Sequence, residues 1–183
     1  MHLKILFSAA ELHAVHTSKD HLVVDCRFAL DNPDAGYDAY LESHIPGAVY
    51  AHLDNELSSP VTHNSGRHPL PEGEKFAVFL SELGWQPGMV MVVYDNMGGA
   101  IAARLWWLMK YFGHSGTAML DGGLPAWVAA GYGLEGGRPR IDPSPVSSYA
   151  QRRELALSAD AVAEGLQSAS IILADARAPE RFN

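Results

Sequence analysis

The sequence predicts an α/β protein built around a central parallel sheet, with helices covering both faces of the sheet. Short segments that are almost wholly apolar alternate with segments in which apolar residues recur at three- and four-residue steps. The first pattern is typical of strands buried on both faces, and the second of amphipathic helices. Apolar residues make up 48% of the chain and charged residues 19%, which is the composition of a globular protein.

Strands and helices are expected in regular alternation along the chain. The strand segments are 5–7, 21–27, a short stretch after the Pro46-Gly47 turn, 89–94 and 117–120. The helical segments are one opened by Ser8 with Glu11 at capping-box spacing, 74–83, 100–113, and one that follows Asp121 and ends at Gly131. Residues 31–40 and 54–74 carry many turn formers and few periodic apolar positions, so we expect loops there.

The segment 89–114 is the centre of this pattern, because its strand, tight loop and helix follow one another directly. It places Asp95 to Gly99 at the carboxyl end of a strand, where open α/β sheets hold their sites. This loop also faces the start of a helix, whose free N–H groups favour an anion or a nucleophile of lowered pKa. No Cys, Ser or His occurs between Asp95 and Arg104. Asp95 can therefore head a site or simply cap the helix, a contribution of about 1 kcal/mol.

Charge and cysteine content narrow the function classes. The net charge of −8, from 13 basic and 21 acidic residues, argues against nucleic acid or an anionic membrane surface as the main partner. A small soluble partner is the expectation.

The amino-terminal residues lack the features of a secretion signal, and no apolar run approaches the ~18 residues that span a bilayer. A single cysteine excludes an internal disulfide, so the expected compartment is the cytoplasm.

A shorter occurrence of the opening pattern begins after residue 154. Three residues recur in order, 150 positions later: Ser8, Asp25 and Arg27 match Ser158, Asp175 and Arg177. Residues 132–150 have the Gly-, Pro- and Ser-rich composition of a linker. We therefore predict a first domain at 1–131, a linker at 132–154 and, at 155–183, the first helix and strand (170–177) of an incomplete second copy. Since one helix and one strand bury little, we expect a longer two-domain protein, or a tail docked on the first domain or on a second copy of the chain.

Few side chains are placed to carry chemistry. Cys26 lies in an apolar strand, so we expect a buried, inert thiol rather than a nucleophile. Asp25 with Arg27, and Asp175 with Arg177, stand at strand ends, where a carboxylate and a guanidinium can tie loops together through backbone hydrogen bonds. A structural role is expected for both pairs.

The irregular segment 54–74 holds one further candidate pair. Asp54 and His68 could form an acid–imidazole pair for general base work, or they could be ordinary solvated loop residues. The nine histidines show no metal-ligand spacing, so we expect no metal and no other cofactor. Of Trp106 and Trp107, one is expected in the core and the other at an interface.

Four motifs in this order resemble the rhodanese superfamily. They are LVVDCRF at 22–28, SHIPGA at 43–48, VVYDNMGGAIAARLWWLMKYFGH at 92–114 and LDGGLPAW at 120–127. The duplication resembles the tandem members of that family, the thiosulfate and 3-mercaptopyruvate sulfurtransferases. The resemblance covers residues 8–131 well and 155–183 in part. It implies an α/β domain that occurs twice, with a catalytic cysteine only in the second copy.

The resemblance also implies roles for individual residues. Asp95 stands where the family's persulfide-forming cysteine would be, which makes this first domain non-catalytic. Arg181 matches an arginine that helps to bind a substrate carboxylate. Asp54 and His68 match a first-domain acid and histidine that assist a serine of the second domain. The implied partners are the missing carboxyl-terminal domain and a small-molecule sulfur donor, and the exposed interface would favour self-association of the isolated chain.

Two other function classes remain for comparison. A non-catalytic rhodanese-like module could bind a partner protein through Trp107 and the tail. A cysteine-based phosphatase needs Cys followed by five residues and Arg, whereas Asp95 and Ile101 occupy those two positions here. The sequence therefore favours the first part of a sulfurtransferase, with an interaction module as the alternative.

Overall fold

The structure is a computed structural model that describes residues 4–176. Contacts divide the chain into two compact units, the first ending at Gln151 and the second beginning at Arg152. Each unit is described by itself. None of the helices within residues 4–176 has the length and apolar character needed to cross a bilayer.

The first unit alternates strands and helices. Its strands are β1 (Leu6–Phe7), β2 (His21–Asp25), β3 (Val49–Tyr50), β4 (Val90–Tyr94) and β5 (Thr117–Leu120). Its helices are α1 (Ala9–Val15), α2 (Ala35–Glu42), α3 (Gly73–Glu82), α4 (Ala102–Tyr111) and α5 (Gly123–Ala129). The second unit holds a short 3₁₀ helix, η1 (Arg153–Leu155), and α6 (Ala159–Gln167).

The five strands form one parallel sheet in the order β1-β5-β4-β2-β3. β4 lies in the middle, and Asp25 at the end of β2 is in register with Tyr94 at the end of β4. Because all strands run the same way, their carboxyl ends meet at one edge of the sheet. This edge receives the chain around Cys26, Asp95 and Asp121, so it is the edge where a site is expected.

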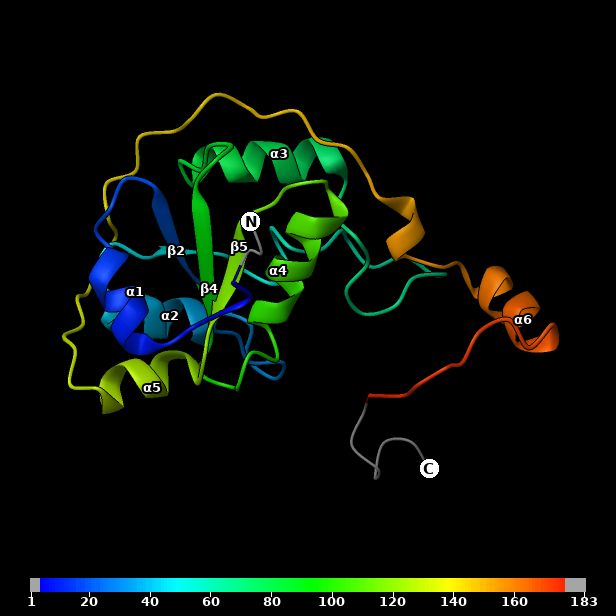
Figure 1. Ribbon diagram of the computed structural model, residues 1–183, viewed down its shortest axis with the longest axis horizontal. Coiled ribbons are helices and arrows are strands. Elements are labelled where there is room, and N and C mark those ends of the chain that lie inside the picture. The colour runs from blue at the N-terminus through cyan, green and yellow to red at the C-terminus, as the bar shows by residue number, and fades with distance from the viewer. Residues whose placement is uncertain (1–3, 177–183) are drawn as a thin grey trace. The chain divides into compact units, whose positions relative to one another are not determined.

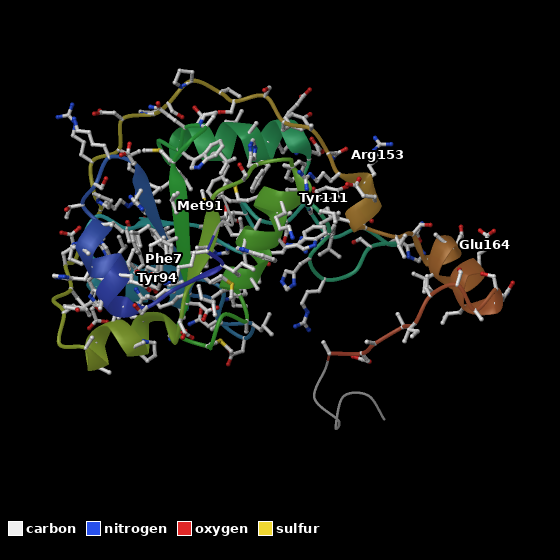
Figure 2. The ribbon with its side chains drawn as sticks, in the orientation of Figure 1. Phe7, Met91, Tyr94, Tyr111, Arg153 and Glu164 are labelled. Atoms are coloured by element: carbon white, nitrogen blue, oxygen red, sulfur yellow. The ribbon has the colours of Figure 1, made fainter. Side chains whose placement is uncertain are left out.

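Helices cover both faces of the sheet, with α1, α2 and α5 on one side and α3 and α4 on the other (Figure 1). On the first face, the strands and helices share one apolar cluster that includes Leu12, Val23, Val92 and Trp127. Met91 and Val93 alternate with Val92, so they face the opposite layer. Met91 and Tyr94 both lie among the side chains that fill this unit (Figure 2). Each fully buried aliphatic side chain contributes about 2 kcal/mol.

Most predicted elements are confirmed. Ser8 caps α1, and its hydroxyl and backbone N–H both engage Glu11 in a capping box. The strands at 5–7, 21–27, 89–94 and 117–120 are present within one or two residues of their expected limits. Residues 54–72 have neither helix nor strand, as expected for that loop.

The loop predicted at 31–40 is wrong, because α2 begins at Ala35. Pro33 and Gly36 in this stretch suggested turns, and few apolar positions are periodic. The helix is stabilised by tertiary contacts instead. Tyr40 is buried, its ring stacks on His44 at 4.2 Å between centroids, and its hydroxyl donates to the Ala48 carbonyl at 2.9 Å. Arg27 also donates to the Ala39 and Ser43 carbonyls at the end of the helix, from twelve and sixteen positions earlier. Contacts of this kind leave no helical periodicity in the sequence.

Two further expectations are corrected. No strand forms in residues 170–176, the described part of the strand predicted at 170–177. A strand needs a hydrogen-bonded neighbour, and the side chains of Ile172 and Leu173 are exposed instead. Neither Trp106 nor Trp107 is buried in the core, since both are only partly covered on α4. The Trp107 ring stacks on Tyr111 and the Trp106 ring lies beneath the Lys110 ammonium group.

Residues 132–151 have the irregular backbone expected of a linker, but they pack on the first unit. Glu135 and His44 exchange two backbone hydrogen bonds, of 2.8 and 2.9 Å. Ser144 is buried, its N–H donates to the Ser81 carbonyl at 2.9 Å, and its hydroxyl donates to the Trp85 carbonyl at 2.5 Å. This segment therefore forms part of the surface of the first unit. The domain limits predicted from the sequence remain predictions.

Candidate functional site

The loop between β4 and α4 closes around the side chain of Asp95. This carboxylate is 1% exposed and accepts four backbone hydrogen bonds. The N–H groups of Met97 and Gly99 donate to Oδ1, each at 2.8 Å. Those of Ile101 and Ala102 donate to Oδ2, at 2.8 and 2.9 Å. We call this ring of four N–H groups the amide cradle.

The backbone of the loop requires glycine where the cradle turns. Gly99 has a φ of 92°, a left-handed conformation that L side chains rarely adopt. Close approach requires a second glycine on the neighbouring helix start, because a Cβ atom on Gly123 would lie 2.2 Å from the Asp95 carbonyl oxygen. That oxygen accepts the Leu124 N–H at 2.9 Å. The loop is thus held from both β4 and α5.

The cradle is built for a negative charge. Four N–H dipoles converge at the start of α4, where the helix dipole is also positive. The N-cap residue of α4 is Ile101, whose own side chain makes no capping bond. Asp95, six positions earlier, takes over this role and accepts the N–H groups of Ile101 and Ala102. A nucleophile on this loop would use the same N–H groups, but a carboxylate neither carries sulfane sulfur nor attacks it at neutral pH. The arrangement stabilises a fixed anion and leaves the loop without a thiol.

The single thiol of the chain belongs to the core. Cys26 follows β2 and is fully buried, and burial raises the pKa of its thiol well above the usual range. The neighbouring negative charges of Asp25 and Asp95 act in the same direction. Because the thiolate is the reactive form of cysteine, this setting is that of a core residue.

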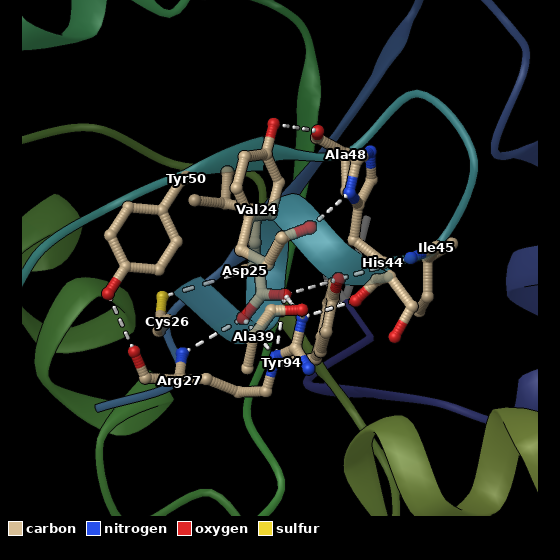
Figure 3. A network of polar contacts seen from close by, with 12 residues as sticks. Val24, Asp25, Cys26, Arg27, Ala39, His44, Ile45, Ala48, Tyr50 and Tyr94 are labelled. Atoms are coloured by element: carbon tan, nitrogen blue, oxygen red, sulfur yellow. Dashed lines mark hydrogen bonds and ion pairs between the residues drawn. The ribbon is translucent and has the colours of Figure 1, made fainter. Parts of the chain in front are cut away.

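Asp25 and Arg27 form the buried ion pair shown in Figure 3. Arg27 Nη2 lies 2.7 Å from Asp25 Oδ2 and also donates to the carbonyls of Ala39 and Ser43, at 3.2 and 2.6 Å. The Tyr94 hydroxyl donates to the same carboxylate at 2.8 Å. Burial and then the Asp25 charge raise the pKa of Tyr94. The pair thus connects the ends of β2 and β4 with the end of α2, the geometry that a structural role requires.

Asp54 and His68 lie together although fourteen positions separate them. His68 Nε2 is 3.1 Å from Asp54 Oδ1, and both side chains keep part of their surface exposed. They line a cavity of about 300 Å³ together with Phe28, Ser58 and Arg67. The Phe28 ring meets the His68 ring edge to face, with centroids 6.5 Å apart. A carboxylate that orients an accessible imidazole can serve a general base.

Sequence reasoning missed Arg104, which connects this pair with the cradle helix. Its Nε donates to the Leu57 carbonyl at 3.2 Å, and its Nη2 donates to the carbonyls of His68 and Pro69, both at 3.0 Å. Burial lowers the pKa of its guanidinium. An arginine in the first turn of a helix gives no sequence signal of contacts with residues some forty positions earlier.

Of the three candidate residues near the carboxyl terminus, the structure describes only Asp175. Asp175 lies in an exposed stretch without regular structure, which differs from the strand end at Asp25. Arg177 and Arg181 lie outside the described residues. The proposed roles of all three therefore remain predictions.

Comparisons with known proteins agree with this architecture. The rhodanese-like domain family matches residues 8–130. A Pseudomonas aeruginosa protein named "Probable 3-mercaptopyruvate sulfurtransferase" is 41% identical over 179 residues, which cover 97% of this chain and 63% of that protein. Thiosulfate/3-mercaptopyruvate sulfurtransferase 2 of Arabidopsis thaliana is 46% identical over 96 residues, or 52% of this chain and 27% of its own.

A solved structure shows the same fold. The crystal structure of SseA from Escherichia coli, described as a 3-mercaptopyruvate sulfotransferase, aligns with a TM-score of 0.88 at 30% identity. The alignment covers 98% of this chain and 68% of that one. The chain spans about 63% of the length of the Pseudomonas relative. The parallel sheet, the loop after β4 and the family match over 8–130 together show that the chain belongs to the rhodanese-like family.

Proposed function

We propose that this chain is the amino-terminal, non-catalytic part of a tandem sulfurtransferase. The complete protein would move sulfane sulfur from 3-mercaptopyruvate or thiosulfate to a thiophilic acceptor such as cyanide or another thiol. Residues 1–131 would form the first rhodanese-like domain, and residues 155–183 would begin the second. The greater length of the relatives and the repeat of Ser8, Asp25 and Arg27 support this organisation.

The observation that carries the proposal is the Asp95 carboxylate in the amide cradle. The loop has the position and the N–H donors suited to a sulfur-bearing thiolate, yet a carboxylate accepts all four hydrogen bonds. Its charge would also repel thiosulfate. Since Cys26 is buried directly after β2, the sulfur-carrying thiol would belong to the second domain.

The first domain would contribute the Asp54–His68 pair to the reaction. In this proposal the imidazole assists a serine of the second domain, and Arg181 binds the carboxylate of the donor. The 3.1 Å contact between His68 and Asp54 supports the first part of this assignment. No resident cofactor is part of the proposal, and the proposed compartment is the cytoplasm.

Cyanide-dependent thiocyanate formation tests the proposal directly. The purified chain 1–183 is assayed with thiosulfate and with 3-mercaptopyruvate, alone and after addition of the carboxyl-terminal part of the protein. We expect no turnover by the chain alone and clear turnover with the added part. Turnover by the chain alone that survives Cys26→Ser would contradict the assignment of the chemistry to the second domain.

One observation favours a second function, a protein-interaction module. Trp106 and Trp107 remain partly exposed on α4, and the Trp107 ring pairs with Tyr111 at 4.9 Å between centroids. Partly exposed aromatic residues are enriched in binding surfaces. Light scattering on the purified chain, before and after Trp107→Ala, would show self-association through this face. A monomer at all concentrations would argue against such a surface for a second copy of the chain.

A further inference from the structure

Arg104 directs its charge at backbone carbonyls of a single loop. Its three hydrogen bonds go to the carbonyl oxygens of Leu57, His68 and Pro69, at 3.0–3.2 Å. Among residues 4–176, no carboxylate lies within ion-pair distance of the guanidinium group. A partly buried cation that has only carbonyl partners is costly to desolvate. The role of Arg104 therefore follows from where these three carbonyls lie in the chain.

The three carbonyls belong to the two ends of the segment that carries the Asp54–His68 pair. Leu57 is fully buried three residues after Asp54, and the His68 carbonyl belongs to the histidine itself. Residues 54–72 have no helix or strand of their own. The Ser59 N–H donates to the Pro69 carbonyl at 3.1 Å, and this one backbone bond joins the two ends of the segment. Arg104 adds three side-chain hydrogen bonds at the same junction, so the contact between His68 Nε2 and Asp54 Oδ1 rests on both.

The anchor stands on a rigid element. Arg104 is in the first turn of α4, two residues after Ala102, whose N–H belongs to the amide cradle. The planar guanidinium presents donors in a fixed fork, so it can bridge carbonyls from both ends of the loop at once. Lysine carries the same charge but cannot hold this geometry. The start of one helix thus holds both the cradle and the backbone of the paired loop.

We infer that Arg104 is a positioning residue that holds the His68 imidazole against the Asp54 carboxylate through the backbone of residues 57 and 68–69. The positioning follows from contacts within this chain. Its effect on sulfur transfer rests on the proposed function. Arg104 does not touch the reacting atoms, so it is not a catalytic residue.

NMR spectra of the His68 ring nitrogens in the chain 1–183 test the positioning itself. A carboxylate can only accept, so the Asp54 contact keeps a proton on His68 Nε2 and makes the two ring nitrogens distinct. We expect Arg104→Met to change the ring spectrum to that of Asp54→Ala, which removes the acceptor. Arg140→Met is the matched control, because this exposed arginine does not line the cavity of Asp54 and His68 and should leave the spectrum as in the wild type. A folded Arg104→Met protein with the wild-type ring spectrum would overturn the inference.

Arg104→Lys keeps the test decisive if Arg104→Met does not fold. Folding is checked by far-UV circular dichroism and by the dispersion of the backbone amide signals. The lysine variant keeps the positive charge without the fork, so we expect a His68 spectrum shifted towards that of Asp54→Ala. If the folded lysine variant gives the wild-type spectrum, the fork is not what holds the ring and the inference fails.

Steady-state kinetics of the chain combined with its carboxyl-terminal part connect the inference to activity. We expect Arg104→Met to lower kcat about tenfold with little change in KM, and to lower it less than twofold in a His68→Asn background. A changed ring spectrum with unchanged kcat would contradict the proposed role of His68 in the reaction, while leaving the positioning intact. If Arg104→Met still lowers kcat tenfold in the His68→Asn background, Arg104 affects the reaction by a route other than His68. That result would overturn the explanation of its kinetic effect by positioning.

Discussion

At the scale of single residues, Asp95 supplies what the loop after β4 needs to keep its shape. Four N–H groups point inward and share one carboxylate. We expect Asp95→Ala to lower the free energy of unfolding by about 3 kcal/mol, because unsatisfied buried donors cost about 1–3 kcal/mol each and water can reach part of this loop. Asp95→Asn should cost less, since one oxygen remains. Urea unfolding measures both variants.

The control for this prediction is the next residue in the loop. The side chain of Asn96 is exposed, so Asn96→Ala should stay within about 0.5 kcal/mol of the wild type. An Asp95→Ala protein as stable as the Asn96→Ala protein would show that the loop does not depend on the carboxylate.

The Asp25–Arg27 pair is a second case in which removing one partner has a large effect. Arg27→Met leaves the Asp25 carboxylate buried with the Tyr94 hydroxyl and a backbone N–H but without its cation. Breaking a buried ion pair in this way costs about 3–5 kcal/mol. Thermal or urea unfolding of Arg27→Met and of the exposed control Arg140→Met would measure the difference. Equal stabilities would contradict a structural role for Arg27.

At the scale of elements, the start of α1 has a stability that depends on pH. Glu11 completes the capping box, and hydrogen bonds from Lys4 and then Ser8 lower the pKa of its carboxyl from 4.5 to about 2. A carboxyl whose pKa is lowered by folding stabilises the fold above its unfolded pKa, and this contribution disappears as the pH falls from about 4.5 to about 2.

Glu11→Gln should therefore be less stable than the wild type at pH 7, and the difference should vanish near pH 2. Urea midpoints between pH 2 and pH 7 measure it. Because the carboxylate is exposed, added salt should reduce the difference at pH 7. A difference that grows as the pH falls would contradict this account of the cap.

At the scale of the whole molecule, the segment 132–151 decides where the first folded unit ends. It contributes buried Ser144, which hydrogen-bonds Ser81 and Trp85, and the Tyr149 ring, which meets Phe112 edge to face. We expect a chain ending at 151 to unfold at the same temperature as the 183-residue chain. A chain ending at 131 should lose at least about 2 kcal/mol, since it lacks the hydrogen bonds of Ser144, the backbone pair of Glu135 with His44 and an aromatic contact.

Differential scanning calorimetry of the three chain lengths checks this prediction. A chain ending at 131 with an unchanged transition temperature would mean that the segment is a linker in energetic terms, as its composition suggested. A chain ending at 151 that is clearly less stable would mean that residues 152–183 stabilise the first unit.

Local patterns predicted the parts of this fold that local interactions determine. The buried strands, the Ser8 cap and the strand–loop–helix around Asp95 all have signals within a few residues of one another. α2 escaped prediction because its contacts reach beyond its own segment: Arg27, at the end of β2, donates to the carbonyls of Ala39 and Ser43. The missing strand at 170–176 shows the reverse case, a strand-like sequence without a neighbouring strand.

The candidate site divides in the same way. The position of Asp95 follows from the end of β4, so it could be predicted, and the proximity of Asp54 and His68 was proposed from their shared loop and from the family resemblance. The contacts of Arg104 could not be predicted, because they join the start of α4 to carbonyls on an irregular segment. Hydrogen bonds to backbone carbonyls leave no trace in the identity of the accepting residues.

The Asp95 carboxylate in the amide cradle affects how this domain can bind anions from solution. Its anion is an intramolecular ligand, attached to the same backbone that binds it, so it cannot diffuse away and its effective concentration does not depend on the buffer. Sulfate, phosphate or an anionic inhibitor would have to displace a group that is always present. A second rhodanese-like copy with an open loop would remain available to such molecules, and a tandem protein could therefore distinguish its two halves by this one side chain.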